Sequence, residues 1–454
     1  MYVELSKIKK VFFVGIGGVG ISAIARLMLL QDKDVSGSDL SASLITSELE
    51  KLGIHIAIGQ SVELIPKDAE LVVYSTAIPK YDAEFFKKLK NFGVKIASYP
   101  EMLGLVTDGK YTIAVSGTHG KTTTTAMVAK VLIDSKHDPS VIVGSLLKDY
   151  KSNLVVGKSN FFVVEACEYE RAFLNIKPKV LIITNIEPDH LDYYKNIKDI
   201  QNAFKQLMSQ TEHLIVFNGQ DKNTSTLVAD YEKNNSKCGV VDYTKYLDKV
   251  PKLSVPGEHN RMNAAAAFVV ADMLNINVAD TQQSLAGFSG TWRRLEKKGE
   301  TKEGTIIYDD YAHHPTEIKA SLQALRELYP HTNDIGVGVY PEGKKITVLF
   351  QPHLYSRTKA LFDDFAKSFK GADKTLLLPI YFAREVKDES ISSEKLAEAI
   401  KKEGDNAQAF PDFASAEEFV KTLNLGPKDV FVTMGAGEAY KVAEKVFDVK
   451  SLSI

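Results

Sequence analysis

The sequence predicts an α/β protein made of three domains. Short apolar runs rich in β-branched residues alternate with helical stretches along the chain, the pattern of largely parallel sheets covered by helices. The 454 residues are 44% hydrophobic and 25% charged, which is the composition of a folded globular protein. At roughly 100 to 200 residues per domain, this length predicts about three domains.

The first domain is expected over residues 1–105. Strand-like runs at 11–16 and 71–75 lie on either side of a helical stretch at 21–30, where apolar residues are nearly continuous. This alternation predicts a parallel α/β sheet.

The second domain is expected over residues 106–290. It opens on a strand-like run, and two further apolar runs predict buried strands; the three runs are 111–115, 161–165 and 180–185. The Ala-rich stretch 260–274 predicts a tightly packed helix at the end of this unit. Residues 287–292 hold two glycines and small polar residues, and they predict a linker.

The third domain is expected over residues 291–454. Four apolar runs separated by helical segments predict another α/β unit; they are 305–308, 346–350, 375–380 and 430–434. The stretch 330–345 is polar and rich in glycine and proline, so it predicts an exposed excursion before the strand at 346.

Charge and cysteine content point to small-molecule partners. Fifty-six Lys and Arg against 58 Asp and Glu give a net charge of −2, which provides no overall attraction for nucleic acid or an anionic membrane. Cys167 and Cys238 are too few for a disulfide scaffold or a four-cysteine zinc site. With no uninterrupted apolar window of about 18 residues, a cytoplasmic location is expected and the sequence leaves a homodimer open.

A glycine-rich loop follows the first strand and opens the first helix. Gly15, Gly17, Gly18 and Gly20 let the backbone approach a phosphate at the positive end of a helix. Asp39 ends the next strand, where a ribose-binding carboxylate is expected; a turn or helix-cap carboxylate is an equal alternative. These features alone would also fit a nicotinamide-dependent dehydrogenase.

A stronger nucleotide signal lies at residues 116–123, between the strand at 111–115 and a helix starting near Thr122. Its glycines expose backbone N–H groups to phosphates, Lys121 supplies a cation, and the Thr122 hydroxyl can bind Mg²⁺. The pattern is shorter than the usual phosphate-binding loop, because Val115 stands where the first glycine would fall. It predicts a P-loop, for which a solvated glycine-rich turn is the weaker alternative.

Two strand ends offer groups that could complete a metal site. Glu165 ends one buried strand, and Asp189 and His190 follow the next. Since the carboxyl ends of parallel strands share one sheet edge with the P-loop, these groups are expected close to Lys121. An ordinary strand-end carboxylate and a structural histidine are the alternatives.

Polar groups around the third domain complete the candidate set. Asn260 and Asn263 could bind an adenine edge, with helix capping as an equal alternative for Asn260. The loop 309–315 ends a strand and starts a helix at Pro315. Arg293, Arg294 and the segment 351–358 add cations suited to an anionic transition state, or simply solvated arginines.

In this order the motifs resemble the Mur ligase family. The resemblance covers essentially the whole chain and runs through 15–20, 36–39, 116–125, 165–168, 184–192, 257–263, 309–315, 350–358 and 435–437. It implies a Rossmann-like first domain that binds a UDP sugar rather than a dinucleotide, and a P-loop central domain that binds ATP and Mg²⁺. It also implies a Rossmann-like third domain that closes over both and helps to hold an amino acid.

The resemblance also implies residue roles. The residues implied in catalysis are Lys121, Glu165, His190, Arg294, His313, His353 and Arg357. Those implied in ATP binding are Gly117, Thr118, His119, Gly120, Lys121, Thr122, Thr123, Asn260 and Asp310. Those implied in UDP-sugar binding are Gly15, Gly17, Gly18, Val19, Gly20, Ser38 and Asp39. The metal is implied at Thr122, Glu165 and His190, and the amino acid at Tyr311 and His313, with His353 and Arg357 facing it and the muramoyl carboxylate.

The implied reaction joins L-alanine to UDP-N-acetylmuramate with ATP, through an acyl phosphate formed on the muramoyl carboxylate. Three positions depart from the pattern expected of the alanine-adding member: Cys167, Leu295 and Glu438. Glu168 followed by Tyr169 is similar to a relative that attaches the L-Ala-γ-D-Glu-diaminopimelate tripeptide to the same sugar nucleotide, so this recycling ligase is the alternative. A non-catalytic nucleotide switch would need the P-loop but not the His- and Asp-rich third domain.

Overall fold

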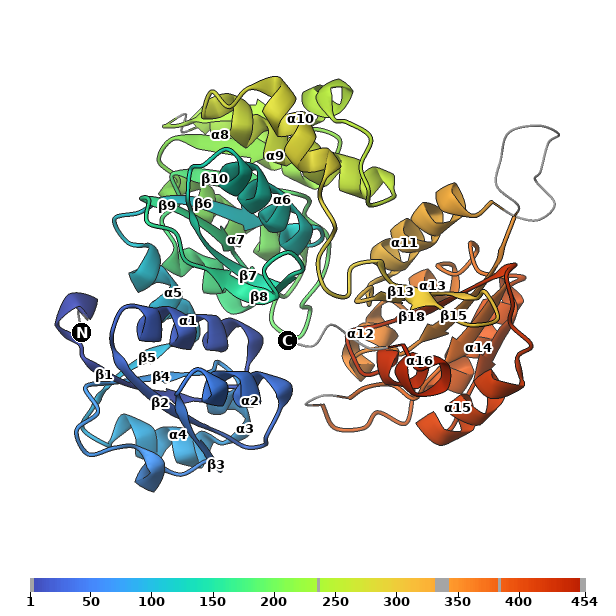
Figure 1. Cartoon of the computed structure of the whole chain (residues 1–454), viewed down its shortest axis with the longest axis horizontal. Coiled ribbons are helices and arrows are strands. Elements are labelled where there is room, and N and C mark those ends of the chain that lie inside the picture. Colours follow the sequence, from blue (N-terminus) through green and yellow to red (C-terminus); the bar gives the residue numbers. More distant parts are fainter. Residues whose placement is uncertain (1–3, 235–236, 331–342, 383–384, 450–454) are drawn as a thin grey trace.

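The computed structural model describes residues 4–234, 237–330, 343–382 and 385–449. Three sheets follow one another along the chain, and each sheet with its helices forms one body (Figure 1). The predicted α/β class with three sheet-containing units is confirmed, whereas the exact boundaries at 105 and 290 stay predictions. Most of the expected excursion at 330–345 lies outside the described residues.

The first body has a five-stranded parallel sheet in the order β3-β2-β1-β4-β5. Its strands are β1 (Lys10–Val14), β2 (Asp34–Asp39), β3 (His55–Ile58), β4 (Leu71–Tyr74) and β5 (Lys95–Ser98). Its helices are α1 (Val19–Leu30), α2 (Leu44–Lys51), α3 (Ile78–Tyr81), α4 (Ala83–Lys90) and α5 (Tyr99–Thr107), with short 3₁₀ helices η1 (Leu5–Lys7) and η2 (Val62–Leu64). Because strand order reverses beside β1, the glycine loop after β1 lies at the point where such sheets bind ligands.

The second body has seven strands in the order β12-β11-β10-β6-β9-β7-β8, parallel except for the β7–β8 pair. They are β6 (Tyr111–Ser116), β7 (Ser140–Leu147), β8 (Ser152–Val155), β9 (Phe161–Glu165), β10 (Val180–Ile183), β11 (Leu214–Phe217) and β12 (Gly239–Asp242). The helices are α6 (Lys121–Asp134), α7 (Ile197–Gln210), α8 (Lys222–Asn234), α9 (Glu258–Met273) and α10 (Val278–Ala286), with η3 (Tyr169–Asn175) and η4 (Tyr243–Lys249). The Ala-rich stretch is α9, and residues 264–267 are fully buried in a core that also contains residues of α6.

The third body has six strands in the order β13-β14-β18-β15-β16-β17, of which only β13 runs antiparallel to its neighbour. They are β13 (Glu296–Glu300), β14 (Ile306–Asp310), β15 (Lys345–Phe350), β16 (Lys374–Leu377), β17 (Ala407–Ala409) and β18 (Asp429–Met434). The helices are α11 (Pro315–Leu328), α12 (Tyr355–Ala360), α13 (Phe362–Ala366), α14 (Ser393–Lys402), α15 (Phe413–Thr422) and α16 (Tyr440–Phe447). Pro315 opens α11 as predicted, and His314 caps it.

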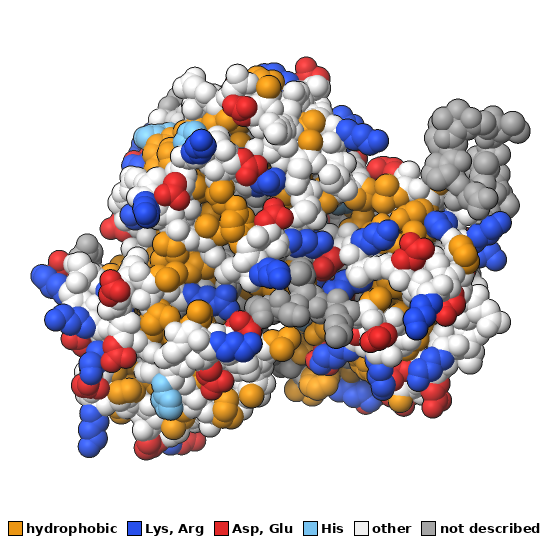
Figure 2. All heavy atoms as spheres, in the orientation of Figure 1, with side chains coloured by type: hydrophobic (Ala, Val, Ile, Leu, Met, Phe, Trp, Pro, Cys, Tyr) orange, Lys and Arg blue, Asp and Glu red, His pale blue; other side chains and the backbone are white. Residues whose placement is uncertain are grey.

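The second body contacts each of the other two. Helices α1 and α5 of the first body pack against β7, β8 and η3 of the second, and α11 of the third body packs against α9. In the orientation of Figure 1, Lys and Arg side chains gather near the middle of the visible face, between the three bodies (Figure 2). No helix in the described part of the chain is long and apolar enough to cross a membrane.

Candidate active site

The loop between β6 and α6 has the geometry of an anion-binding site. At Gly117 φ is +130°, and an added Cβ would lie 2.0 Å from the Thr184 hydroxyl oxygen. Gly120 caps α6 with φ at +82°, and its Cβ would lie 2.7 Å from Asn263 Oδ1. Only glycine fits these two places. No side chain caps α6, so the N–H groups of its first turn remain available for a phosphate.

Lys121, the first residue of α6, has its amine held over the loop. Its Nζ donates to the carbonyl oxygens of Gly117 and Thr118 and to Glu168 Oε1, which lies 3.0 Å away. Burial alone would lower the pKa of Lys121, but the neighbouring acidic groups, Glu168 first and then Glu165 among them, together outweigh it and raise the pKa above its usual value. The lysine is therefore charged before any nucleotide arrives.

Glu168 was given no role by the sequence reasoning. Its side chain is only 3% exposed, which places a buried anion directly beside the P-loop cation. The sequence signal was its position three residues after Glu165, where the chain leaves β9 at the sheet edge that carries the P-loop.

Thr122 and Glu165 are brought together, as expected for a metal site. The Thr122 hydroxyl donates to Glu165 Oε2 at 2.9 Å, and the same oxygen accepts from the backbone N–H of Gly144. A hydroxyl and a carboxylate at a P-loop are the oxygen ligands that Mg²⁺ prefers. His190 lies instead beside Glu168, with its Nε2 3.7 Å from Oε1, so its place among the metal ligands stays a prediction.

A cavity of about 220 Å³ lies between α9 of the second body and α11 of the third. The predicted residues that line it are His119, Gly120, Thr122, Thr123, Asn260, Arg294 and Asp310. The side chain of Asn260 donates to the carbonyl oxygen of Pro256, and Gly257 rather than Asn260 caps α9. Burial raises the pKa of Asp310 to about 6, although Ser321 donates a hydrogen bond to its carboxylate.

The glycine loop of the first body is fixed by the strand beside it. Gly15 donates its backbone N–H to the carbonyl oxygen of Ser38, and Gly17 donates to Asp39 Oδ2 at 2.8 Å. Val19 begins α1, which has no side-chain cap. Asp39 thus stabilises the glycine turn, which is the structural role considered beside ribose binding. Contact of Asp39 with a ribose stays a prediction. The N–H groups at the start of α1 remain available for a diphosphate.

The residues expected near the amino acid form one chain of contacts. The rings of Tyr311 and His313 lie 5.3 Å apart, and those of His313 and His353 lie 6.1 Å apart. Arg357 contacts His353 at 3.2 Å and donates two hydrogen bonds to Asp189 of the second body. Burial, with the charge of Arg357 among the other causes, lowers the pKa of His353 to about 3, so this imidazole is neutral near pH 7.

Two adjacent arginines have separate functions. The side chain of Arg293 is 5% exposed and bonds Asp309 and the carbonyl oxygens of Gly435 and Gly437, all within the third body. Arg294 lines the cavity between α9 and α11, with its Nη2 3.4 Å from the Thr122 hydroxyl. Only Arg294 is therefore placed to meet a phosphate.

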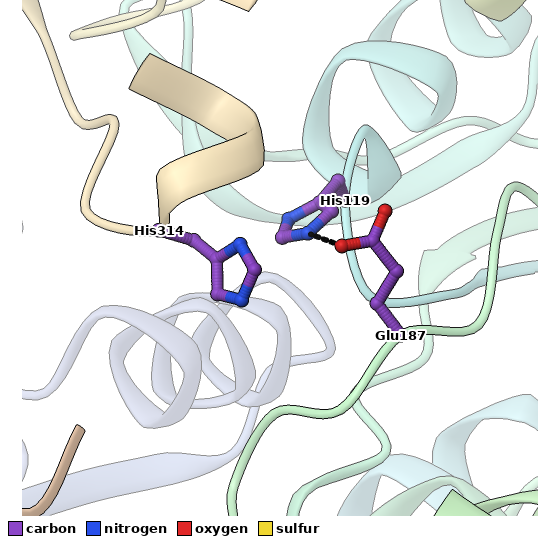
Figure 3. Close-up of side chains that lie close together, drawn as sticks. All are labelled: His119, Glu187 and His314. Atoms are coloured by element: carbon purple, nitrogen blue, oxygen red, sulfur yellow. Dashed lines mark ion pairs between the residues drawn. The ribbon is translucent and has the colours of Figure 1, made fainter. Parts of the chain in front are cut away.

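His119, Glu187 and His314 bring two imidazoles and a carboxylate together, with candidate ligand atoms within 4.8 Å of one another (Figure 3). Their contacts favour an ion cluster over a metal site. His119 Nδ1 lies 3.0 Å from Glu317 and its Nε2 lies 3.5 Å from Glu187, so both ring nitrogens face carboxylates. His314 Nδ1 accepts the backbone N–H of Thr316 as a helix cap. His119 therefore joins the P-loop to the start of α11 as a charged imidazolium.

Because of this cluster, we expect the free energy of unfolding to decrease at alkaline pH. Burial lowers the pKa of His119, but Glu187 and Glu317 outweigh it and raise the pKa from 6.5 to about 9. A raised pKa stabilises the fold fully below about pH 6.5, and this contribution is lost as the pH rises through 9. We expect a loss of roughly 1 to 3 kcal/mol in unfolding free energy between these values, at about 1.4 kcal/mol per pKa unit.

Urea unfolding at pH 6 and pH 9.5 measures this loss. In Glu317→Gln the difference in unfolding free energy between the two pH values should be smaller. His55→Gln, on the exposed end of β3, is the matched control and should leave the pH dependence unchanged. Equal pH dependence in the wild type and Glu317→Gln would contradict the assignment.

Known protein families match this chain along most of its length. Three family models match in succession: "Mur ligase family, catalytic domain" at residues 10–111, "Mur ligase middle domain" at 115–249, and "Mur ligase, glutamate ligase domain" at 293–437. A UDP-N-acetylmuramate–L-alanine ligase of Clostridium kluyveri is 40% identical, covering 98% of this chain and 99% of that protein. One of Caldanaerobacter subterraneus is 37% identical, covering 99% of both.

Solved structures extend the comparison. The UDP-N-acetylmuramate-alanine ligase MurC of Thermotoga maritima superposes with a TM-score of 0.77 at 28% identity, covering 97% of this chain and 98% of that one. The murein peptide ligase of Psychrobacter arcticus gives a TM-score of 0.67 at 21% identity over the same shares, a likeness of fold. With three matched models and near full-length relatives at about 40% identity, this chain belongs to the Mur ligase family.

Proposed function

We propose that this protein joins L-alanine to the lactoyl carboxylate of UDP-N-acetylmuramate in peptidoglycan synthesis, with conversion of ATP to ADP and phosphate. The observation that carries the proposal is the contact of Arg294 from the third body with Thr122 of the P-loop helix, in the wall of a cavity formed by two bodies. Lys121 precedes Thr122 in the same helical turn. The relatives at 37–40% identity are named for this reaction.

The chemistry requires two anions to meet. A carboxylate oxygen attacks the γ-phosphorus of ATP and ADP leaves. The alanine nitrogen, as the free amine, then attacks the acyl carbon; phosphate leaves, and the nitrogen releases one proton and keeps the other in the amide. Lys121 and Arg294 neutralise the phosphate charge, an effect for which one positioned donor is worth about 10²- to 10³-fold in rate. Mg²⁺, held by Thr122 and Glu165, would neutralise further charge on the phosphate oxygens.

Two ion pairs join the third body to the second beside the cavity. Glu317 of the third body binds His119 of the P-loop, and Arg357 binds Asp189 across the same gap. Closure of this kind protects an acyl phosphate from hydrolysis. Arg357 also offers a cation for the carboxylate of the incoming amino acid.

The proposal also covers the metal, the cellular location and the assembly of the enzyme. We propose Mg²⁺ as the metal, and the cytoplasm as the location, in keeping with the free thiols of Cys167 and Cys238. A homodimer is the assembly to test by sedimentation velocity.

The test is phosphate release from ATP and Mg²⁺ with UDP-N-acetylmuramate. L-alanine, glycine, the L-Ala-γ-D-Glu-diaminopimelate tripeptide and no amine are compared, with product mass measured in parallel. Stimulation by L-alanine with the matching mass gain is expected. Phosphate release stimulated by the tripeptide alone would make the protein the recycling ligase, which Glu168 followed by Tyr169 favours. No stimulation of phosphate release by any amine would overturn the ligase assignment.

A further inference from the structure

Residues 168–171, here named the linking segment, run from the P-loop to the first body. At one end Glu168 binds Lys121, and at the other Glu170 pairs with Lys80 of α3 at 2.6 Å. Glu170 and Arg171 both have positive φ, +52° and +57°, which is unfavourable for residues with a Cβ. Such strain persists where surrounding contacts fix it, and it concentrates at functional sites.

The ring of His190 depends on this segment for its orientation. Among the described residues no hydrogen bond reaches the imidazole, and its nearest carboxylate oxygens, from Glu168 and Asp189, each lie 3.7 Å from Nε2. The Tyr169 ring lies against it, with centroids 4.6 Å apart and a 41° tilt. Tyr169 is therefore the contact that fixes the imidazole.

Tyr169 is itself tied to two bodies. Its hydroxyl donates to Asp192 Oδ2 at 2.8 Å and accepts from Lys80 Nζ at 2.6 Å. Lys80 lies in α3, which follows β4, and β4 pairs with β1, the strand that leads into the glycine loop. A continuous path of contacts thus joins the sugar-nucleotide side of the molecule to Lys121 through Tyr169 and His190.

We propose that Tyr169 is a positioning residue that holds the His190 imidazole beside the Lys121–Glu168 pair and, through Lys80, makes this placement depend on the position of the first body. The inference rests on the proposed function, because it assigns His190 a part in that reaction. Its consequence is that a sugar nucleotide seated on the first body orders a group next to the ATP phosphates.

The kinetic test uses three substitutions in the full chain. Tyr169→Leu removes the ring and is expected to lower kcat roughly 10-fold to 100-fold, the cost of losing an orienting contact, with the KM for ATP changed less than about twofold. Tyr169→Phe loses the hydroxyl but keeps the ring, over which Lys80 Nζ lies 4.5 Å from the centroid, and it should recover most of the rate. Tyr193→Leu is the matched control, since Tyr193 is an exposed ring that contacts the Tyr169 ring edge-on, at 6.2 Å.

A double-mutant cycle separates positioning from general destabilisation. If Tyr169 acts through His190, Tyr169→Leu should have no further effect in a His190→Ala background. The same fold loss of kcat in both backgrounds would overturn the proposal.

A measurement without substrates separates this inference from the proposed function. In a protein with ring-labelled histidine, the His190 NMR signal is assigned by His190→Ala, and it should move in Tyr169→Leu and Lys80→Met but not in Tyr193→Leu. An unmoved signal would overturn the positioning role even if ligation is confirmed. A moved signal in a protein that shows no alanine-dependent phosphate release would support the positioning role and reject the ligase assignment.

Discussion

Lys121→Ala is expected to lower kcat for ligation by about 10²- to 10³-fold. The amine is fixed by two P-loop carbonyl oxygens and Glu168 at the uncapped start of α6, so it is in place for phosphate charge that grows during transfer. Phosphate release with L-alanine measures the loss. A rate near that of the wild type would remove Lys121 from the reaction.

Removal of Lys121 alone leaves Glu168 buried without its cation, which can destabilise the fold. The double variant Lys121→Met with Glu168→Gln removes both charges and should lose activity while unfolding near the wild-type denaturant concentration. Lys130→Ala is the matched control, because Lys130 lies on the same helix and pairs with Asp134 one turn later, away from Glu168. It should retain full activity.

Arg293→Met is expected to lower the unfolding free energy by about 3 to 5 kcal/mol, the cost of leaving one partner of a buried ion pair alone. Arg293 holds Asp309 of β14 and the two carbonyl oxygens that follow β18, so the loss falls on the centre of the third sheet. Denaturant unfolding can be followed by Trp292, the single tryptophan, which adjoins Arg293 in the chain.

Arg294→Met provides the comparison, since the two arginines are neighbours in sequence. It should change stability by less than about 1 kcal/mol and slow ligation, whereas Arg293→Met with Asp309→Leu should recover part of the lost stability. Equal destabilisation by Arg293→Met and Arg294→Met would contradict the division of roles.

The sequence predicted those parts of the fold whose local pattern is strong. The run before Lys121 is apolar and β-branched and is followed by glycines, so both β6 and the start of α6 could be placed from neighbours alone. Thr122 and Glu165 could be paired because the carboxyl ends of parallel strands share one edge. By contrast, β13 has the sequence Glu-Lys-Lys-Gly-Glu, whose charges conceal a strand at the edge of the third sheet.

The rest depended on contacts that no local pattern encodes. The resemblance implied a role for Arg294 and none for Arg293, and the buried ion pair of Arg293 with Asp309 became known only from the direction of its side chain. His119 and Glu317 lie 198 residues apart in the chain, and their bond exists because α11 packs on the body that carries the P-loop. Glu168 could be recognised in the sequence as an acidic residue, but its ion pair with Lys121 could not be predicted.

The cavity proposed for ATP has one wall on α9 of the second body and the other on α11 of the third. With the nucleotide enclosed in this way, we expect ADP to leave only after the third body moves away, so that the rate of opening limits turnover. Weakening the bond between His119 and Glu317 should shorten the residence time of ADP. The dissociation rate of a fluorescent ADP, measured by stopped flow, should be higher for Glu317→Gln than for the wild type.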